Sequence, residues 1–537
     1  MTEDNSASQF QFVKTDDPGI IKELYTLCGS EWSGQLTPEQ FGEIMQQDHL
    51  EYVDKNKDKL LTFVIQDTSK NNKVVACACV RIVDGFYKPG DKSPTISSVP
   101  DPNLFGVKNV TVLLIAYVFT HKDYRKNGLA QKCVSGAIEH TENSIIQQAI
   151  TRSDETKPDN FKRLVLDDNG DVDTSLANDY LSKEYFWMLY SGVQTYYERF
   201  GFKAYPLDFY ELPLTNPLSE GQEAIVKQLI QNEQHASAKS LGKELKLIRG
   251  DNEADQELIK FMLQTRELEM VTELNKLNYH SELETPHKSA TSLTNLTDLL
   301  VLSKSTSATP LSCALEENSP NTPPAAHTQS ISKLALKPSY DTFRWNVLLE
   351  QYSAKKLHAD IPSVIEYTNI QGAILTNHHQ SKSYYILWNT LMQRDLYILS
   401  MGEIEFENLN NPTMGSSLGG IVNELDGYNF QDLDILISLA VYVAKMRSVL
   451  NVYVSVNDLP ENVPKTVMYD FFMKYYPNAS SFSNENDKNS ENSDNIKVKL
   501  VTDAITEMNF LPMLKLFGNN NSNFDLDWID SGMLSWG

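Results

Sequence analysis

Long apolar runs are absent from this sequence of 537 residues. A membrane-spanning helix needs about 18 or more consecutive apolar residues, and none of the runs is that long. The first residues, Met1 to Gln9, are acidic and polar, and they lack the basic start and apolar core of a secretory signal. We therefore expect a cytoplasmic protein that has no membrane partner.

Positive charge and cysteine are also scarce. The sequence has 47 Lys and Arg against 71 Asp and Glu, a net charge of −24, which argues against nucleic acid as a partner. An odd, scattered set of cysteines favours buried thiols in a reducing compartment over disulfides. The ten histidines show no zinc spacing, so no metal site is predicted. The five cysteines are Cys28, Cys77, Cys79, Cys133 and Cys313.

The chain is long enough for several domains, and its order of predicted strands and helices indicates an α/β (α+β) protein. A hydrophobic content of 41% and a charged content of 22% are typical of a globular chain with polar inserts. Residues 281–338 are dense in Ser, Thr and Pro, which favours disorder. We expect an N-terminal domain (1–215), a helical connector (216–280), this mostly disordered insert (281–338), and a C-terminal α/β domain (339–537) with a disordered loop near 479–495.

Periodicity and turn residues predict the order of elements in the first domain. Asp16 or Asp17 is expected to cap the first helix and Thr37 the second. Residues 84–105 are rich in Gly and Pro and are predicted to be a loop. The predicted elements are a strand at 10–13, helices at 18–28 and 37–53, strands at 60–66, 74–82 and 110–117, a helix to about 150, a strand at 186–189 and a closing strand at 208–212.

The most informative stretch is a basic turn between a strand and a helix. The apolar run Val110 to Tyr117 predicts a buried strand, and the chain past Ala130 has helical periodicity. Between them lies Arg125-Lys126-Asn127-Gly128. Such a turn directs backbone N–H groups and the positive end of the helix dipole at one point, which suits a pyrophosphate. Gly128 has no Cβ, so the backbone can approach the ligand closely.

Two motifs resemble those of the GCN5-related N-acetyltransferase (GNAT) superfamily. Arg125 to Ala130 resembles its Arg/Gln-x-x-Gly-x-Gly/Ala motif, and Tyr197 to Phe202, after the strand Phe186 to Leu189, resembles its Tyr-x-x-x-Gly-Phe motif. The resemblance implies a mixed sheet in which two parallel strands splay apart after the first motif. The thioester of acetyl-CoA, the implied co-substrate, would lie in that gap.

A wider resemblance points to the fungal lysine N6-acetyltransferase family. It rests on Glu31 to Phe41, on Val118-Phe119-Thr120, and on Phe510 to Gly518 with Trp528 and Trp536-Gly537 near the C-terminus. It implies acetyl transfer to the side-chain amine of free L-lysine, giving N6-acetyl-L-lysine in lysine catabolism. Cys79-Val80-Arg81 departs from the more polar pattern expected on the third strand.

The resemblance also assigns site residues. Tyr197 is the candidate acid that protonates the leaving thiolate, with Tyr196 as an alternative. A backbone N–H at Val118 or Phe119 would stabilise the oxyanion. Ser191 either holds water or cofactor or caps a helix. The candidate cofactor-binding residues are Val118, Phe119, Thr120, Arg125, Lys126, Asn127, Gly128, Leu129, Ala130 and Ser191.

The base and the exact acceptor stay open at this stage. A free lysine amine has a pKa of about 10.4, so the site needs a base or a desolvated pocket. Glu31, Glu51 and Asp167-Asp168 are candidates, and Trp32 either lines the substrate mouth or packs in the core. Alternative functions are acetylation of another small amine such as a polyamine, acetylation of protein lysines, or acyl-CoA binding without catalysis. A C-terminal domain that covered the cleft would exclude a protein substrate.

The C-terminal half has a strand, strand, helix, strand order that suggests a degenerate acetyltransferase-like unit. The predicted elements are a hairpin formed by 383–388 and 396–400, a helix at 433–450 and a strand at 451–456. Its glycine-rich segment, Met414 to Gly420, has no Arg or Lys beside the glycines. We therefore expect no second cofactor site, and the oligomeric state is left open.

Overall fold

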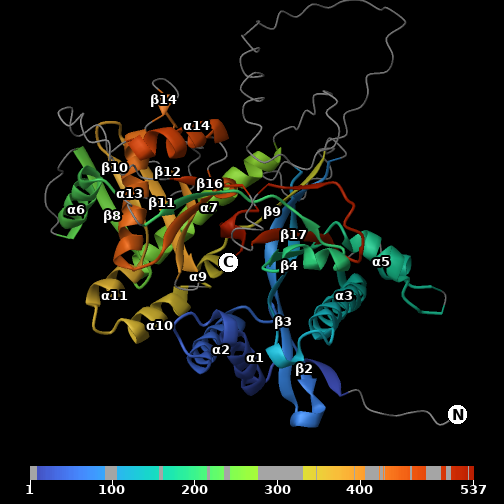
Figure 1. Cartoon of the computed structure of the whole chain (residues 1–537). Helices are drawn as coiled ribbons and strands as arrows, with labels where there is room; N and C mark the ends of the chain where they lie inside the picture. Colours follow the sequence, from blue (N-terminus) through green and yellow to red (C-terminus); the bar gives the residue numbers. More distant parts are fainter. Residues whose placement is uncertain are drawn as a thin grey trace, which may run out of the picture.

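Two β-sheets with helices packed on them make up the protein (Figure 1). In the part of the chain that the structure describes, no helix is long and apolar enough to cross a membrane. The computed structural model describes residues 9–90, 106–156, 161–167, 169–214, 218–234, 242–275, 331–345, 347–391, 394–404, 422–423, 427–428, 430–459, 463–478, 498–502, 510–529 and 531–536.

The first sheet is mixed, as predicted. Its strand order is β1-β2-β3-β4-β5-β17-β6, with β9 added to β3 and β18 added to β9. β4 and β5 are parallel, whereas β1, β2, β3 and β4 are successively antiparallel. The strands are β1 (Phe10–Lys14), β2 (Leu60–Asp67), β3 (Lys73–Lys88), β4 (Lys108–Thr120), β5 (Tyr185–Ser191), β6 (Lys203–Ala204), β9 (Ser332–Leu336), β17 (Leu511–Leu516) and β18 (Leu526–Trp528).

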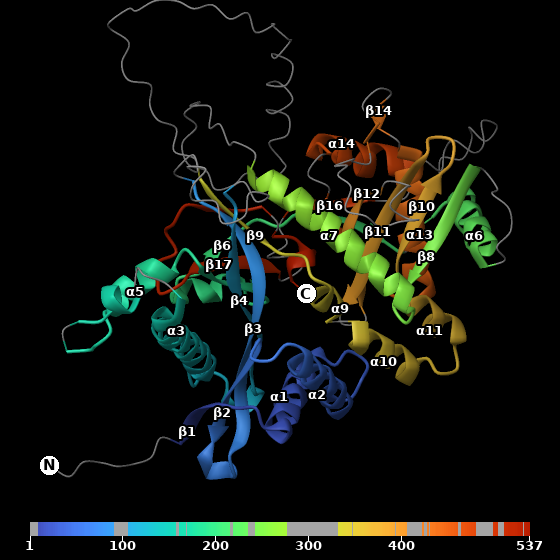
Figure 2. The same cartoon turned by 180° about the vertical axis from the view of Figure 1, so that it is seen from behind.

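Helices cover both faces of this sheet (Figure 2). α1 (Pro18–Trp32) and α2 (Pro38–Lys55) pack on one face, and α3 (Leu129–Thr156) packs on the other. Asp17 caps α1, and Thr37 forms a reciprocal capping box with Gln40 at the start of α2. Local capping chemistry therefore sets where both helices begin, as the sequence predicted.

The predicted loop at 84–105 is wrong at its start, because β3 continues to Lys88. Gly85 is a point of close approach between strands, not a turn. A Cβ on Gly85 would lie 2.8 Å from the Val112 side chain and 3.0 Å from the Ala335 carbonyl oxygen. β9 pairs with β3 here, so Ser332–Leu336, predicted to lie in the disordered insert, form a strand instead.

The strand predicted to close the first sheet does not belong to it. β7 (Phe209–Pro213) pairs with β15 and β16 of the second sheet. The position beside β5 is taken by β17, which pairs antiparallel with both β5 and β6. The apolar alternation of a strand predicts which face is buried, but it does not identify the partner strand. The chain division proposed near residue 215 stays a prediction.

The second sheet has the order β16-β7-β15-β12-β11-β10-β8. The predicted hairpin is confirmed by β11 and β12, and β12 pairs in parallel with β15 after the apolar helix α13. Residues 218–277 were predicted to be helical throughout, but β8 lies between two helices there. The elements are β8 (Lys243–Arg249), β10 (Ile370–Asn377), β11 (Lys382–Leu391), β12 (Asp395–Ile404), β15 (Asn451–Ser455), β16 (Lys499–Val501), α6 (Glu220–Gln234), α7 (Glu253–Asn275) and α13 (Phe430–Met446).

Short elements complete the described chain. A 3-10 helix, η5 (Gln194–Phe200), follows β5, and a two-stranded ribbon joins β13 (Val422–Asn423) to β14 (Gly427–Tyr428). Residues 281–330 of the predicted disordered insert, the predicted disordered loop 479–495, the glycines of 414–420, Cys313 and Asp168 lie outside the described residues. The remaining helices are α4 (Phe161–Val165), α5 (Thr174–Leu181), α9 (Tyr340–Arg344), α10 (Val347–Leu357), α11 (Pro362–Thr368) and α14 (Lys465–Asp470).

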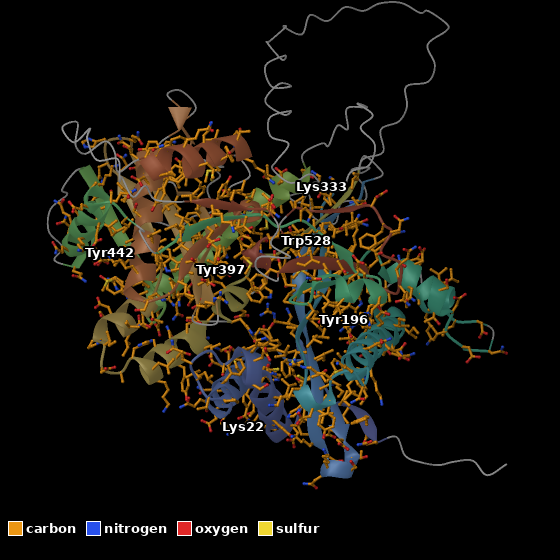
Figure 3. The ribbon with its side chains drawn as sticks, viewed as in Figure 1. Lys22, Tyr196, Lys333, Tyr397, Tyr442 and Trp528 are labelled. Atoms are coloured by element: carbon orange, nitrogen blue, oxygen red, sulfur yellow. The ribbon has the colours of Figure 1, made fainter. Side chains whose placement is uncertain are left out.

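The two sheets are joined by segments that come from far along the chain. α9 and α10 lie beside α2 in both views (Figures 1 and 2). Trp528, on β18 (Figure 3), makes edge-on ring contacts with Tyr190 of β5 and with Tyr205. The C-terminal half thus packs directly on the first sheet near α2 and β5.

Candidate active site

The splay that the sequence predicted is present between β4 and β5. Their parallel pairing runs from Thr111 opposite Tyr185 to Ile115 opposite Leu189. Beyond that point β4 continues to Thr120, held by β3 on its other side, without further pairing to β5. The backbone of β4 past Ile115 therefore faces a gap, which is where a thioester would lie.

A β-bulge sits on β4 beside this gap. Cys77 is opposite Phe119 and Cys79 is opposite Ala116, so Tyr117 and Val118 have no register partner on β3. Tyr117 has a φ of 53°, which is unusual for a bulky residue and marks local strain. Bulges re-aim the side chains and amides of a strand. The two candidate oxyanion donors, Val118 and Phe119, therefore lie where the strand bends.

The basic turn has the conformation that an anion site requires. Lys126 and Gly128 both have a φ of 71°, and α3 begins at Leu129. Alternating left-handed residues before a helix bring successive N–H groups to one concave point. A Cβ built on Gly128 meets nothing within 4 Å, so the space in front of it is open. These residues fit a pyrophosphate.

Hydrogen bonds hold the turn in place. Tyr124 donates from its hydroxyl to Asp67 Oδ2 (3.0 Å), and Asn127 donates from its side-chain amide to the Tyr124 carbonyl (3.2 Å). Arg125 donates through Nε to the Thr120 carbonyl at 3.2 Å. The charged ends of Arg125 and Lys126 are exposed, and Ala130 is half-buried, so two cations flank the open space at Gly128.

Tyr197 lies on η5, close to the helix that the basic turn begins. Its ring contacts Tyr196 (5.1 Å between centroids) and Phe202 (6.2 Å). Burial, followed by the nearby Tyr196 and the Cys133 thiol of α3, raises the pKa of Tyr197. The phenol therefore keeps its proton at neutral pH, as a group that must donate one requires.

Comparison with known families decides what this arrangement is. Residues 21–162 match the acetyltransferase (GNAT) family, a range that contains the splayed strand β4 and the basic turn. This part of the chain is similar to GNAT acetyltransferases. A comparison with curated proteins gives no match. The finer resemblance to fungal lysine N6-acetyltransferases stays a prediction.

Solved structures with a similar arrangement come from several sources. A GCN5-related N-acetyltransferase from Kribbella flavida is 10% identical, with 95% of this chain and 72% of that chain covered and a TM-score of 0.33. A tandem GNAT protein from the clavulanic acid biosynthesis pathway is 9% identical, with 95% and 99% covered and a TM-score of 0.35. A probable N-acyltransferase from Enterococcus faecalis V583 is 8% identical, with 95% and 72% covered and a TM-score of 0.37. These scores are too low to support any inference.

The Ser191 hydroxyl makes two hydrogen bonds to nearby backbone groups. Its hydroxyl donates to the Gln194 carbonyl at 2.6 Å and accepts from the Val193 N–H at 3.2 Å, and the residue is buried. It closes the turn between β5 and η5 but does not cap η5, whose N-cap residue is Val193. A contact of Ser191 with the cofactor stays a prediction.

The candidate bases lie in different places. Glu31 is at the end of α1, 3.5 Å from the Arg125 guanidinium, and both side chains are more than half exposed. A hydrogen bond from Lys55, aided by Arg344, lowers the pKa of Glu51 and makes it a poor base at neutral pH. Asp167 accepts two backbone N–H groups in a turn of its own. No group of three or more metal-ligating side chains occurs among the described residues.

We call the face of the first sheet opposite α3, on which α1 and α2 pack, the acceptor face. Aromatic rings line that face: Trp32 lies edge-on to Phe119 (5.4 Å) and to Tyr117 (6.3 Å). Trp345, the residue after α9, donates from Nε1 to the Tyr117 hydroxyl at 2.9 Å. Trp32 is only half-buried, which agrees with a place at the mouth. The sequence had no signal for Tyr117 or Trp345.

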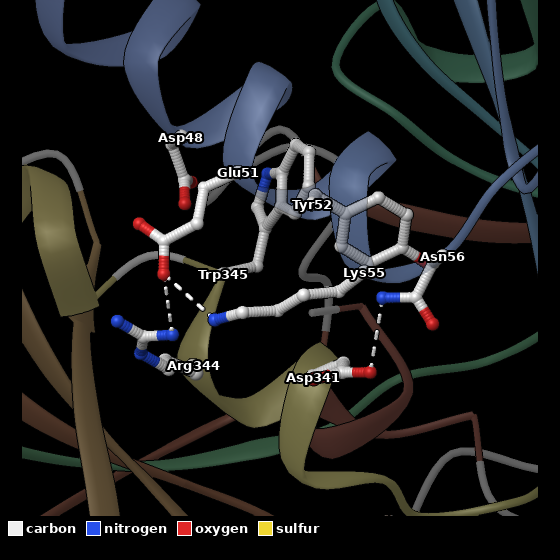
Figure 4. Close-up of a pocket in the computed structure, with 8 residues that line it drawn as sticks. All are labelled: Asp48, Glu51, Tyr52, Lys55, Asn56, Asp341, Arg344 and Trp345. Atoms are coloured by element: carbon white, nitrogen blue, oxygen red, sulfur yellow. Dashed lines mark hydrogen bonds and ion pairs between the residues drawn. The ribbon is translucent and has the colours of Figure 1, made fainter.

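A small pocket opens on this face between α2 and α9 (Figure 4). Glu51 Oε1 joins Lys55 at 2.8 Å and Arg344 at 3.1 Å across it. Asp48 lies at its wall, and burial raises the pKa of that carboxyl to about 7. The signal for Asp48 was its place on the apolar face of α2. The lining is Asp48, Glu51, Tyr52, Lys55, Asn56, Asp341, Arg344 and Trp345.

Gly128→Glu should abolish tight CoA binding. The new carboxylate would face the pyrophosphate, and like charges at about 4 Å repel by ~4 kcal/mol at an effective dielectric constant near 20. We expect the Kd for CoA, measured by calorimetry, to rise by ~10²–10³-fold.

The matched control is Gly170→Glu. Gly170 also has a positive φ (84°) and open space around it, but it lies outside the turn. Both variants should lose similar stability in thermal unfolding, and only Gly128→Glu should lose CoA. Unchanged CoA affinity in Gly128→Glu would show that the cofactor does not lie at this turn.

Proposed function

We propose that this GNAT enzyme transfers the acetyl group of acetyl-CoA to the side-chain amine of free L-lysine, giving N6-acetyl-L-lysine in lysine catabolism. The observation that carries the choice of a small acceptor is the hydrogen bond from Trp345 to Tyr117. Through this bond Trp345, from the C-terminal half, covers part of the acceptor face beside a small pocket, which favours a small acceptor over a folded protein. The resemblance at both ends of the chain supports lysine among small amines.

The proposed chemistry is direct acetyl transfer with Tyr197 as the acid. The neutral amine attacks the thioester carbon, and a C–N bond forms as the C–S bond breaks. The backbone at Val118 or Phe119 stabilises the oxyanion, and Tyr197 gives its proton to the departing thiolate. The amine loses its extra proton to solvent or to a carboxylate on the acceptor face, aided by desolvation.

A small excess of acidic side chains in the pocket lining supports a cationic acceptor. Asp48, Glu51 and Asp341 contribute carboxylates, against the two cations Lys55 and Arg344. An amine that enters as an ammonium ion is attracted by such a lining before it loses its proton. The same feature would suit a polyamine. An experiment must therefore test whether the enzyme requires the carboxyl group that lysine has and a polyamine lacks.

A mass-spectrometric screen tests the proposal directly. Purified enzyme and acetyl-CoA are incubated with free amino acids, with spermidine and with a lysine-containing peptide, and Gly128→Glu serves as the inactive control. We expect one acetyl group on free lysine, at N6, and little product from the peptide. Preference for spermidine would replace lysine with a polyamine as substrate. CoA binding without any product would indicate a non-catalytic acyl-CoA-binding protein.

A further inference from the structure

Two buried side chains of opposite charge lack hydrogen-bond partners on the acceptor face. Arg81 on β3 is 4% exposed, and neither its Nε nor one of its terminal nitrogens has a partner among the described residues. Asp48 on α2 is 7% exposed, and its Oδ2 also lacks a partner there. Neither group makes an ion pair within 4 Å among those residues.

Both groups lie between the bulge of β4 and the pocket. The Arg81 guanidinium lies over the Trp345 ring at 5.1 Å, and the same indole donates to the Tyr117 hydroxyl. Asp48 and Trp345 both line the pocket. Arg81 belongs to the stretch Cys79-Val80-Arg81, which departs from the pattern of the lysine N6-acetyltransferase family. It therefore lies on the acceptor face.

Unpaired buried charges are costly, so they indicate a missing partner. Removing an ion from water costs several kcal/mol unless a counter-charge and hydrogen bonds replace the water. Burial lowers the pKa of Arg81 and raises that of Asp48, although each charge partly offsets the other. The nearby cations Arg344 and Lys55 are already bound to Glu51. A ligand that carries both charges can supply hydrogen bonds to the unpartnered atoms of Arg81 and Asp48.

We propose that Arg81 binds the α-carboxylate and Asp48 the α-ammonium group of a free amino-acid acceptor, an inference that rests on the proposed acetyl transfer to free lysine. A guanidinium binds a carboxylate through two parallel hydrogen bonds, and a single carboxylate suffices for an ammonium. A ligand that carries both groups on one carbon satisfies both side chains at once. A diamine or a peptide lysine does not.

The dimensions suit an acceptor with a long side chain. Phe119, beside the gap, is opposite Cys77, and Arg81 is four residues further along β3. At about 3.3 Å per residue this separation is roughly 13 Å. An extended lysine side chain spans roughly 6 Å of this separation, so its amine lies closer to the gap than the α-amine, which stays at Asp48.

Three acceptors distinguish the contact of Arg81 with a carboxylate from the contact of Asp48 with an ammonium group. Lysine has both head groups, 6-aminohexanoate has only the carboxylate, and 1,5-diaminopentane has only a second ammonium. Loss of one charged hydrogen-bond partner costs ~1.5–3 kcal/mol. For Arg81→Met we expect kcat/KM to fall ~10- to 100-fold with lysine and 6-aminohexanoate, mainly through KM, and to change less than about threefold with 1,5-diaminopentane. Asp48→Asn should impair lysine and 1,5-diaminopentane and spare 6-aminohexanoate.

The control is Lys59→Met, an exposed cation just before β2 whose side chain lies 3.8 Å from Asp84. It should leave all three acceptors unchanged. Thermal unfolding and CoA calorimetry show whether each variant is folded. A variant that loses all three acceptors alike, although it still binds CoA, would overturn the inference without touching the proposed function. Parent enzyme that acetylates none of the three would instead overturn the proposed function itself.

Discussion

Tyr197→Phe should lower kcat by ~10²–10⁴-fold, the value of a positioned general acid, while the affinity for CoA stays nearly constant. The substitution removes only the hydroxyl and keeps the ring that packs against Tyr196 and Phe202. Because the ring is buried and its contacts are kept, we expect thermal unfolding to change little. Single-turnover kinetics at saturating acetyl-CoA and lysine measure the chemical step directly.

Tyr196→Phe is the matched control. In a 3-10 helix adjacent side chains point about 120° apart, and Tyr196 is half-buried beneath the Arg199 guanidinium, 4.2 Å from its ring. We expect a change of only a few-fold in kcat. If Tyr197→Phe remains within a few-fold of the parent rate in the single-turnover experiment, Tyr197 is not the acid, and a large loss in Tyr196→Phe would move the role to its neighbour.

Removal of residues 511–537 should prevent folding. β17 joins β5 to β6, and Leu511, Met513 and Leu514 on it are almost fully buried. Each buried side chain of this size contributes ~1.5–3 kcal/mol. The loss of these three alone is comparable to the whole stability of a typical domain, ~5–15 kcal/mol. We expect an aggregating chain without a cooperative thermal transition and without CoA binding.

A shorter truncation tests whether β17 carries this effect. A chain ending at Asn523 keeps β17 but loses β18 and the last 3-10 helix, whose Met533 N–H donates to Asp458 Oδ2 at 2.6 Å. It should unfold cooperatively at a lower temperature than the full chain. Cooperative unfolding of the longer truncation near the parent temperature would show that β17 is dispensable.

The sequence by itself determined those features that depend on neighbouring residues. Thr37, Pro38 and Gln40 predicted the start of α2, because a capping box needs only residues three apart. The glycine turn and the strand before it were also predicted, since periodicity and a positive-φ glycine are local signals. The resemblance of two local motifs to the GNAT superfamily then indicated an acetyltransferase and selected Gly128 and Tyr197 for testing.

Only the tertiary structure decided which distant segments meet. The strand at 209–213 has a correct local pattern, yet its partners lie in the second sheet, and β17 from near the end of the chain replaces it beside β5. Trp345 reaches Tyr117 across 228 residues. Arg81 and Asp48 become a pair of unsatisfied charges only when α2, β3 and α9 pack together. Hydrophobic patterning specifies a buried face, but contacts between distant residues depend on the packing of the whole chain.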